Sequence, residues 1–151
     1  MTTAGSDGSS AAHARPGAAQ EPFRTRQMTL PATGQAAGLA RRAMRDALVF
    51  WKLGHLEETA VLLVSELVGN AVRHARTDGV AVELRLETTG TWLRIEVLDA
   101  DPRPPLPRTP ADLDESGFGF VLIEALADKW GVRETGVGKA VWAELDIETP
   151  R

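Results

Sequence analysis

Cysteine, long apolar runs and an excess of basic residues are all missing from this chain of 151 residues, and each absence removes a class of function. Without cysteine there are no disulfides or thiolate metal ligands, and only three histidines remain as imidazole ligands, so we do not expect a zinc site. No apolar run reaches the roughly 18 residues of a membrane-spanning helix, and no signal peptide is visible, so we expect a cytoplasmic protein that does not contact a membrane. The formal net charge of −4 argues against direct binding of nucleic acid.

The length and a hydrophobic content of 43% suit one domain with a single core. Residues 1–22 offer few side chains that could offset the entropy lost when a chain becomes ordered, so we predict a disordered N-terminal tail. Residues 23–151 then form a single domain.

Helical spacing and strand alternation divide this domain into elements. In chain order we expect an edge strand over 23–33, a helix over 33–54, a helix over 56–76, an antiparallel hairpin of 80–88 and 91–99, a proline-rich loop over 101–116, a helix over 118–130 followed by Gly131, and a closing hairpin of 131–135 and 140–148. The apolar side of the first helix is expected to hold Leu39, Ala43, Ala47 and Phe50. This order predicts an α+β fold, a two-layer α/β sandwich with one mixed, mostly antiparallel sheet and helices packed on one face.

The stretch SELVGNAVRHA, residues 65–75, places four polar side chains inside the otherwise apolar second helix. Residues three or four apart share one side of a helix, so Glu66, Asn70 and Arg73 or His74 form a polar stripe. Burying a carboxylate and an amide there is costly unless each finds a partner. Two interpretations stay open: Glu66 pairs with Arg73 while Asn70 bonds a neighbouring loop, or Glu66 is a base and Asn70 an oxygen ligand of Mg²⁺.

Two further features follow this helix in the chain. The strand ending IEVLDAD brings Asp99 to the edge of the sheet, and SGFGF, residues 116–120, puts a pair of glycines at the start of the third helix. Glycines at a helix N-terminus let backbone N–H groups approach an anion, which the helix dipole also favours.

These motifs resemble the Bergerat-fold, histidine-kinase-like ATPases of gyrase, heat-shock chaperones, histidine kinases and mismatch-repair proteins. They look most like the anti-sigma-factor serine/threonine kinase branch of actinobacterial type. SELVGNAVRHA is similar to the N box of that branch, VLDADPRPP to its first glycine box, and GFGFVLIEALADKWGV with GKAVWAEL to its second glycine box and closing strands. The resemblance covers roughly Phe23 to Ile147.

The resemblance implies a role for each matching residue. Glu66 would orient or deprotonate the attacking hydroxyl, Asn70 would coordinate the Mg²⁺ that bridges the phosphates of ATP, and Asp99 would accept the adenine amino group. Gly117 and Gly119 would correspond to the glycines of the lid over the phosphates. The other positions implied to contact the nucleotide are Arg73, His74, Phe118 and Phe120.

Three residues depart from the family pattern. Asp101 stands where a glycine is common and is followed by prolines, which lack a backbone donor. Phe118 stands where related sequences often have arginine, and a benzyl group cannot pair with phosphate. Ala140 stands where a threonine usually helps to hold the adenine, and losing one such hydrogen bond costs on the order of 1 kcal/mol.

The resemblance implies an ATP-dependent serine/threonine protein kinase that phosphorylates a small antagonist protein, sequesters a sigma factor and forms a homodimer. The departures leave open a second function, a catalytically weak or inactive module that sequesters its partner and binds ATP structurally or not at all. A detached ATPase domain of a histidine kinase is a third possibility. It is disfavoured because we see no dimerisation helix with a phosphoacceptor histidine before the domain.

Overall fold

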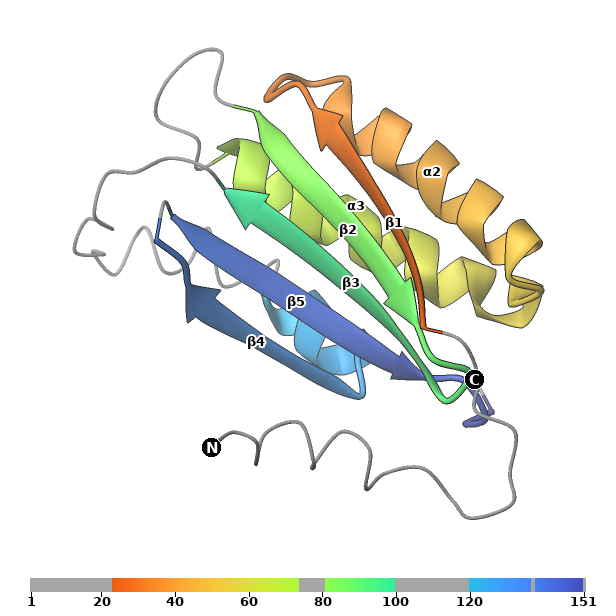
Figure 1. Ribbon diagram of the computed structural model, residues 1–151. Helices are drawn as coiled ribbons and strands as arrows, with labels where there is room; N and C mark the ends of the chain where they lie inside the picture. The colour runs from red at the N-terminus through yellow and green to blue at the C-terminus, as the bar shows by residue number, and fades with distance from the viewer. Residues whose placement is uncertain (1–22, 74–80, 100–119, 137, 151) are drawn as a thin grey trace, which may run out of the picture.

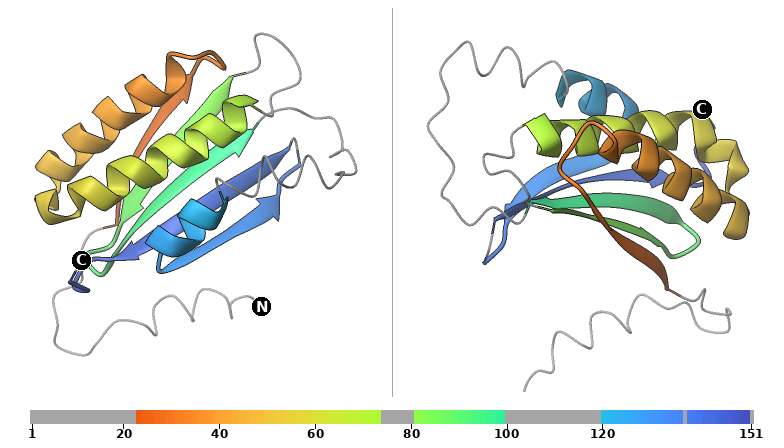
Figure 2. Two further views of the ribbon diagram at one scale, coloured as in Figure 1. Left: turned by 180° about the vertical axis from the view of Figure 1, so that it is seen from behind. Right: turned by 90° about the horizontal axis from the view of Figure 1, so that it is seen from above.

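The computed structural model describes residues 23–73, 81–99, 120–136 and 138–150. The predicted tail, the proline-rich loop and the start of the third helix lie outside these residues. Within them, one sheet is covered by helices on one face and left open on the other (Figure 1, Figure 2).

Five strands form the sheet, and the alternation of apolar and polar residues is clearest over residues 82–88. The strands are β1 (Arg24–Leu30), β2 (Val82–Thr88), β3 (Trp92–Asp99), β4 (Lys129–Glu134) and β5 (Lys139–Asp146). They lie in the order β1-β2-β3-β5-β4, and every neighbouring pair is antiparallel. The predicted edge strand and both predicted hairpins are confirmed.

The helices form the second layer. They are α2 (Ala36–Phe50), a short 3₁₀ turn η1 (Gly54–Leu56), α3 (Glu57–Arg73) and the helical residues 120–126. All of them lie on the same side of the sheet (Figure 2), which confirms the predicted two-layer α+β sandwich. None of the helices in the described part of the chain has the length and apolar character needed to cross a membrane.

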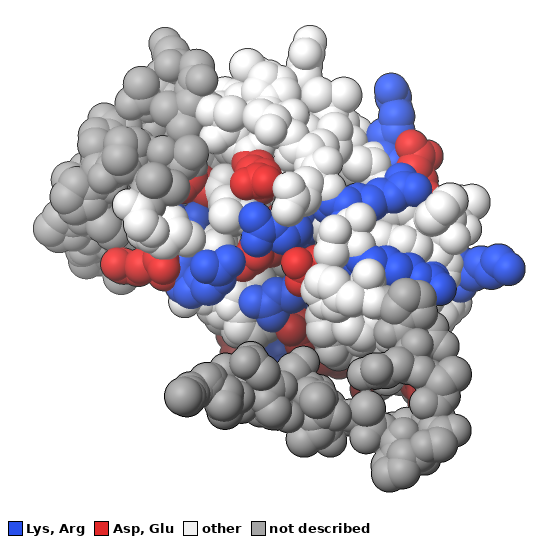
Figure 3. All heavy atoms as spheres, in the orientation of Figure 1, with Lys and Arg blue, Asp and Glu red and all other residues white. Residues whose placement is uncertain are grey.

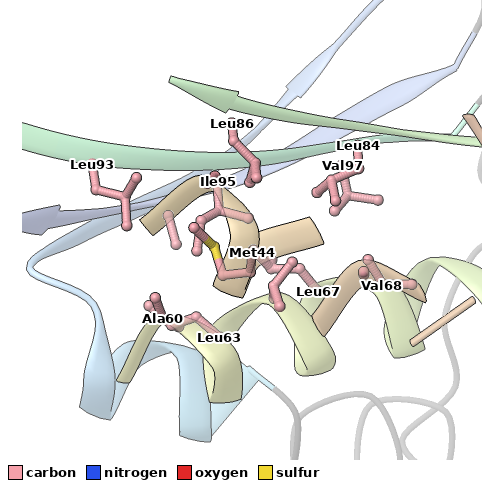
Figure 4. Packing of buried hydrophobic residues seen from close by; sticks show 14 of the residues in the cluster. Met44, Ala60, Leu63, Leu67, Val68, Leu84, Leu86, Leu93, Ile95 and Val97 are labelled. Carbon is pink, nitrogen blue, oxygen red and sulfur yellow. The ribbon is translucent and has the colours of Figure 1, made fainter. Parts of the chain in front are cut away.

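One apolar core fills the space between the two layers. Met44 of α2 and Leu63 and Leu67 of α3 face the inward side chains of β2 and β3 (Figure 4). The strand side of this contact is formed by Leu84, Leu86, Leu93, Ile95 and Val97. Burying each such side chain stabilises the fold by about 1.5–3 kcal/mol relative to exposing it, so this contact fixes how α3 lies on the sheet.

The buried side of α2 differs from the expected one. Its buried residues are Ala36, Ala40, Met44, Ala47 and Leu48. Of the four residues expected there, Ala47 is buried, Leu39 and Ala43 are partly buried against the core, and Phe50 is 71% exposed. The expectation for Phe50 is wrong because Trp51, one residue further on, closes this end of the core instead.

The third helix is shorter than predicted. Its helical residues end at 126 and β4 begins at Lys129, so Gly131 lies inside a strand and does not follow the helix. A Cβ atom on Gly131 would stand 2.8 Å from Cζ2 of Trp142 on β5. Glycine is needed here because the indole of the neighbouring strand lies against its backbone.

The open face of the sheet carries basic and acidic side chains interspersed with one another (Figure 3). Glu96 of β3 is only 3% exposed, although no helix covers it. Its carboxylate accepts hydrogen bonds from Arg85 of β2 at 3.3 Å and from Nε of Arg133 of β4 at 3.0 Å, and Nη2 of Arg133 forms an ion pair with it at 2.8 Å. Arg94 pairs with Glu144 of β5 at 2.6 Å. Ion pairs on this face therefore tie four adjacent strands together.

Candidate functional site

A pocket lies where the last turn of α3 meets the end of β3 and the start of β5. It is lined by Asn70, Ala71, Val97, Asp99, Phe120, Lys139 and Val141. The cavity itself is small, about 20 Å³, and it opens to solvent. Its walls are apolar except for three side chains: an amide, a carboxylate and an ammonium group.

The register between β3 and β5 brings the strand residues of the pocket together. Val97 is opposite Val141 in the antiparallel ladder, and Asp99 is opposite Lys139. Because side chains alternate between the two faces of a strand, these four share the face that the helices cover. The pocket is therefore a gap in the helical layer at one end of the sheet.

Asn70 is the polar residue that α3 brings to this pocket. It is 5% exposed, and its Nδ2 has no hydrogen-bond partner among the described residues. Its Oδ1 accepts a hydrogen bond from Nη2 of Arg73, one turn further along the helix. A buried donor left without a partner costs about 1–3 kcal/mol, so this amide suits a ligand that accepts a hydrogen bond.

The first of the two interpretations of the polar stripe, in which Glu66 pairs with Arg73, is therefore wrong in its pairing. Arg73 donates to Asn70, whereas that interpretation paired Arg73 with Glu66. Glu66 is half-buried on α3, one turn before Asn70, and is not among the residues that line the pocket.

Asp99 is the acidic residue of the pocket. It is the last residue of β3 and is 9% exposed. Val97 and Val141 stand beside it on the same face of the sheet. Its carboxylate presents hydrogen-bond acceptors at this end of the pocket.

Among the other residues implied by the resemblance, only Phe120 lies in the described part of the chain. It lines the pocket, and its ring packs against Trp130 with the ring centroids 5.3 Å apart. His74, Gly117, Phe118 and Gly119 lie outside the described residues, as does Asp101.

Ala140 does not stand where the sequence analysis expected it. Lys139 and Val141 line the pocket, so Ala140 between them faces the opposite side of the sheet. The residue of this segment that faces the ligand space is Lys139, which the sequence analysis missed. Counting back by two from Val141 along the strand would have found it.

The chemistry of these side chains suits a purine nucleotide. Asp99 can accept the amino group of adenine, and the valines and Phe120 can contact the faces of the ring. Asn70 lies on the helix beside this space, and its amide donor has no partner among residues 23–73, 81–99, 120–136 and 138–150, so it can bind a ligand acceptor such as a phosphate oxygen. The donor set is oxygen and nitrogen only, which suits Mg²⁺ bound mainly through phosphates.

Comparison with known proteins agrees with this picture. The model of the histidine kinase-like ATPase domain family matches residues 29–145. A stretch of 59 residues is 48% identical to an uncharacterized protein of Streptomyces coelicolor and covers 38% of this chain and 56% of that protein. The chain thus matches little more than half of that relative.

A solved structure shares the fold. The crystal structure of the RsbU and RsbW domains of Rv1364c from Mycobacterium tuberculosis matches with a TM-score of 0.63 and 21% sequence identity. The match covers 83% of this chain and 33% of that chain. With the family model spanning most of the described domain and the pocket in place at the end of the sheet, the chain belongs to the histidine kinase-like ATPase domain family.

Proposed function

We propose that this protein is an ATP-binding serine/threonine protein kinase of the anti-sigma-factor type. It phosphorylates a small antagonist protein and sequesters a sigma factor. The observation that carries the proposal is the pocket, in which the buried Asp99 carboxylate and the buried, half-satisfied Asn70 amide face one space with apolar walls. Membership of the ATPase family and the fold shared with an RsbW domain support it.

In this proposal the pocket holds the adenine end of ATP. The adenine amino group donates to Asp99, while Val97, Val141 and Phe120 contact the ring. The Asn70 oxygen would hold Mg²⁺ together with the phosphates, and the ion would neutralise part of the phosphate charge.

The phosphate end of ATP lies beyond Asn70. Arg73 and His74 follow it along the same polar stripe and contact the phosphates. Gly117, Phe118 and Gly119 lie outside the described residues; the resemblance implies that they contact the phosphates, and Phe118 could do so only through its backbone N–H because it has no cationic side chain.

Glu66 is the proposed base. It lies one helical turn, about 5.4 Å along the axis, before Asn70. A half-buried carboxylate at this point can accept the proton of a serine or threonine hydroxyl as that oxygen attacks the γ-phosphorus, while the bond from the γ-phosphorus to the bridging oxygen breaks and ADP leaves. Phosphoryl transfer depends mostly on positioning and charge neutralisation, so one base beside one amide is a sufficient protein contribution.

Radiolabelled ATP tests the activity. With Mg²⁺ and the antagonist protein, the wild type should produce phosphoserine or phosphothreonine, and Glu66→Ala should abolish transfer while leaving ATP binding in place. No transfer to any candidate antagonist would reject the kinase. A pull-down from the native cytoplasm, with and without ATP, should recover a sigma factor, and sedimentation should show the homodimer.

Calorimetry tests the nucleotide site separately. Asp99→Asn keeps the shape of the side chain but replaces one acceptor oxygen with a donor. Losing a hydrogen bond to a charged acceptor costs about 1.5–3 kcal/mol, so ATP affinity should fall roughly 10- to 100-fold. Unchanged binding of ATP by this variant would contradict the assignment of the pocket.

One observation favours the second function, a partner-sequestering module that is catalytically weak or inactive. The Asn70 oxygen needed for a metal ion is engaged by Arg73 in this structure. In that case sigma factor would be recovered equally from wild type and Glu66→Ala, and no phosphate would reach the antagonist.

A further inference from the structure

Lys139 is a pocket residue to which neither the sequence motifs nor the proposed function gives a role. It is the first residue of β5 and stands directly opposite Asp99 of β3. Residues opposed in an antiparallel ladder have Cβ atoms about 4.5–5.5 Å apart. A carboxylate and an ammonium group therefore enter the same end of the pocket from neighbouring strands.

The two side chains offer complementary hydrogen bonding. The carboxylate of Asp99 only accepts, and the ammonium of Lys139 only donates. Adenine presents the matching pattern, because its amino group is a donor and the two ring nitrogens that flank it, N1 and N7, are acceptors. A base that donates to Asp99 brings one of these nitrogens towards the next strand, where Lys139 begins.

The surroundings strengthen such a contact. Lys139 is half-buried, and Val97 and Val141 form the adjoining walls. Apolar walls lower the local dielectric, so a hydrogen bond from a cation contributes more there than in water. Within the part of the chain that the structure describes, Nδ2 of Asn70 in the same pocket has no hydrogen-bond partner, which independently indicates that a ligand completes its hydrogen bonding.

We propose that Lys139 is a base-recognition residue that donates from Nζ to N1 or N7 of adenine, beside the bond from the amino group to Asp99. The inference rests on the proposed binding of ATP and adds a specificity determinant to it. Two opposed side chains on β3 and β5 then read two adjacent atoms of the purine.

The experiment combines a variant with altered bases. Lys139→Met keeps the length of the side chain and removes every donor, and Lys139→Arg is the matched control that keeps charge and donors. Each protein is titrated calorimetrically with ATP, 1-deaza-ATP and 7-deaza-ATP in the presence of Mg²⁺. Wild type should bind one of the two analogues about 5- to 20-fold more weakly than ATP. Lys139→Met should bind ATP and that analogue alike, and Lys139→Arg should still discriminate.

The outcomes separate this inference from the proposed function. Discrimination that persists in Lys139→Met, or wild type that binds both analogues as tightly as ATP, would overturn the role of Lys139 and leave the nucleotide site intact. Wild type that does not bind ATP at all would overturn the proposed function and this inference with it. Lys139→Ala is measured in parallel, so that a folding defect in the methionine variant does not decide the result.

Discussion

Replacing Arg73 by methionine should reveal how strongly its guanidinium competes for the Asn70 oxygen. In the structure Nη2 of Arg73 donates to Oδ1 of Asn70, the atom assigned to Mg²⁺ in the proposed function. A metal ion can use that oxygen only after the hydrogen bond is broken. Arg73 is largely exposed, so we take the net value of a typical hydrogen bond, about 0.5–1.5 kcal/mol. Without this competing hydrogen bond, the factor by which Mg²⁺ increases the affinity for ATP should rise roughly 2- to 10-fold.

The assay is the ratio of two dissociation constants for ATP, one measured with EDTA and one with Mg²⁺. Arg73→Met should increase this ratio. Metal-free ATP also binds more weakly to this variant, since the guanidinium that can approach its phosphates is gone. Arg41→Met is the matched control, since Arg41 contacts Ser65 at 3.4 Å and does not line the pocket. A ratio that stays the same or falls in Arg73→Met would refute the competition between guanidinium and metal ion.

Two further predictions concern the sheet that supports the pocket. Gly131→Ala should lower the free energy of unfolding by about 1–3 kcal/mol because its methyl group would stand 2.8 Å from Trp142. Gly38→Ala, at an exposed position of α2, is the control and should not destabilise the protein. Equal urea midpoints for the two variants would contradict this. Glu96→Gln should lower the free energy of unfolding by about 1–3 kcal/mol because three arginines lose the negative charge that they share. Glu57→Gln, in an exposed ion pair, should lower it by less than about 1 kcal/mol. Thermal unfolding measures the stability of these two glutamate variants. A Glu96→Gln protein as stable as Glu57→Gln would show that the buried ion-pair cluster is not stabilising.

The hairpin of β2 and β3 was predictable because both strands alternate polar and apolar residues on either side of a short polar turn. The boundary between the third helix and β4 was not. Ile123, Leu126, Ala127 and Trp130 keep helical spacing, so the periodicity continues past the true end of the helix. What ends the helix is a partner far away in sequence: the N–H of Asp128 donates to the backbone oxygen of Glu144 at 2.9 Å. Local periodicity contains no information about that strand.

The pocket was predictable in part, for a related reason. The motif resemblance pointed to Asn70 and Asp99, and both line the pocket. Lys139 was missed because Trp142, an aromatic residue on the open face, obscures which side of β5 is inward. The inward series runs through Val141, Ala143 and Leu145, and only the register with β3 extends it back to Lys139.

The open face of the sheet explains why residue 140 is small without reference to the nucleotide. Arg133 on β4 reaches Glu96 on β3 at 2.8 Å, and β5 lies between these two strands. The side chain of Arg133 therefore has to cross β5, and its ladder partner there is Ala140, which is completely buried although no helix covers it. A larger residue at 140 would obstruct this crossing.

The same β3–β5 register that aligns Glu96 with its arginines on one face also aligns Asp99 with Lys139 on the other. The ion pairs thus hold the strands in the alignment that the pocket requires, and the two faces of the sheet share one structural constraint.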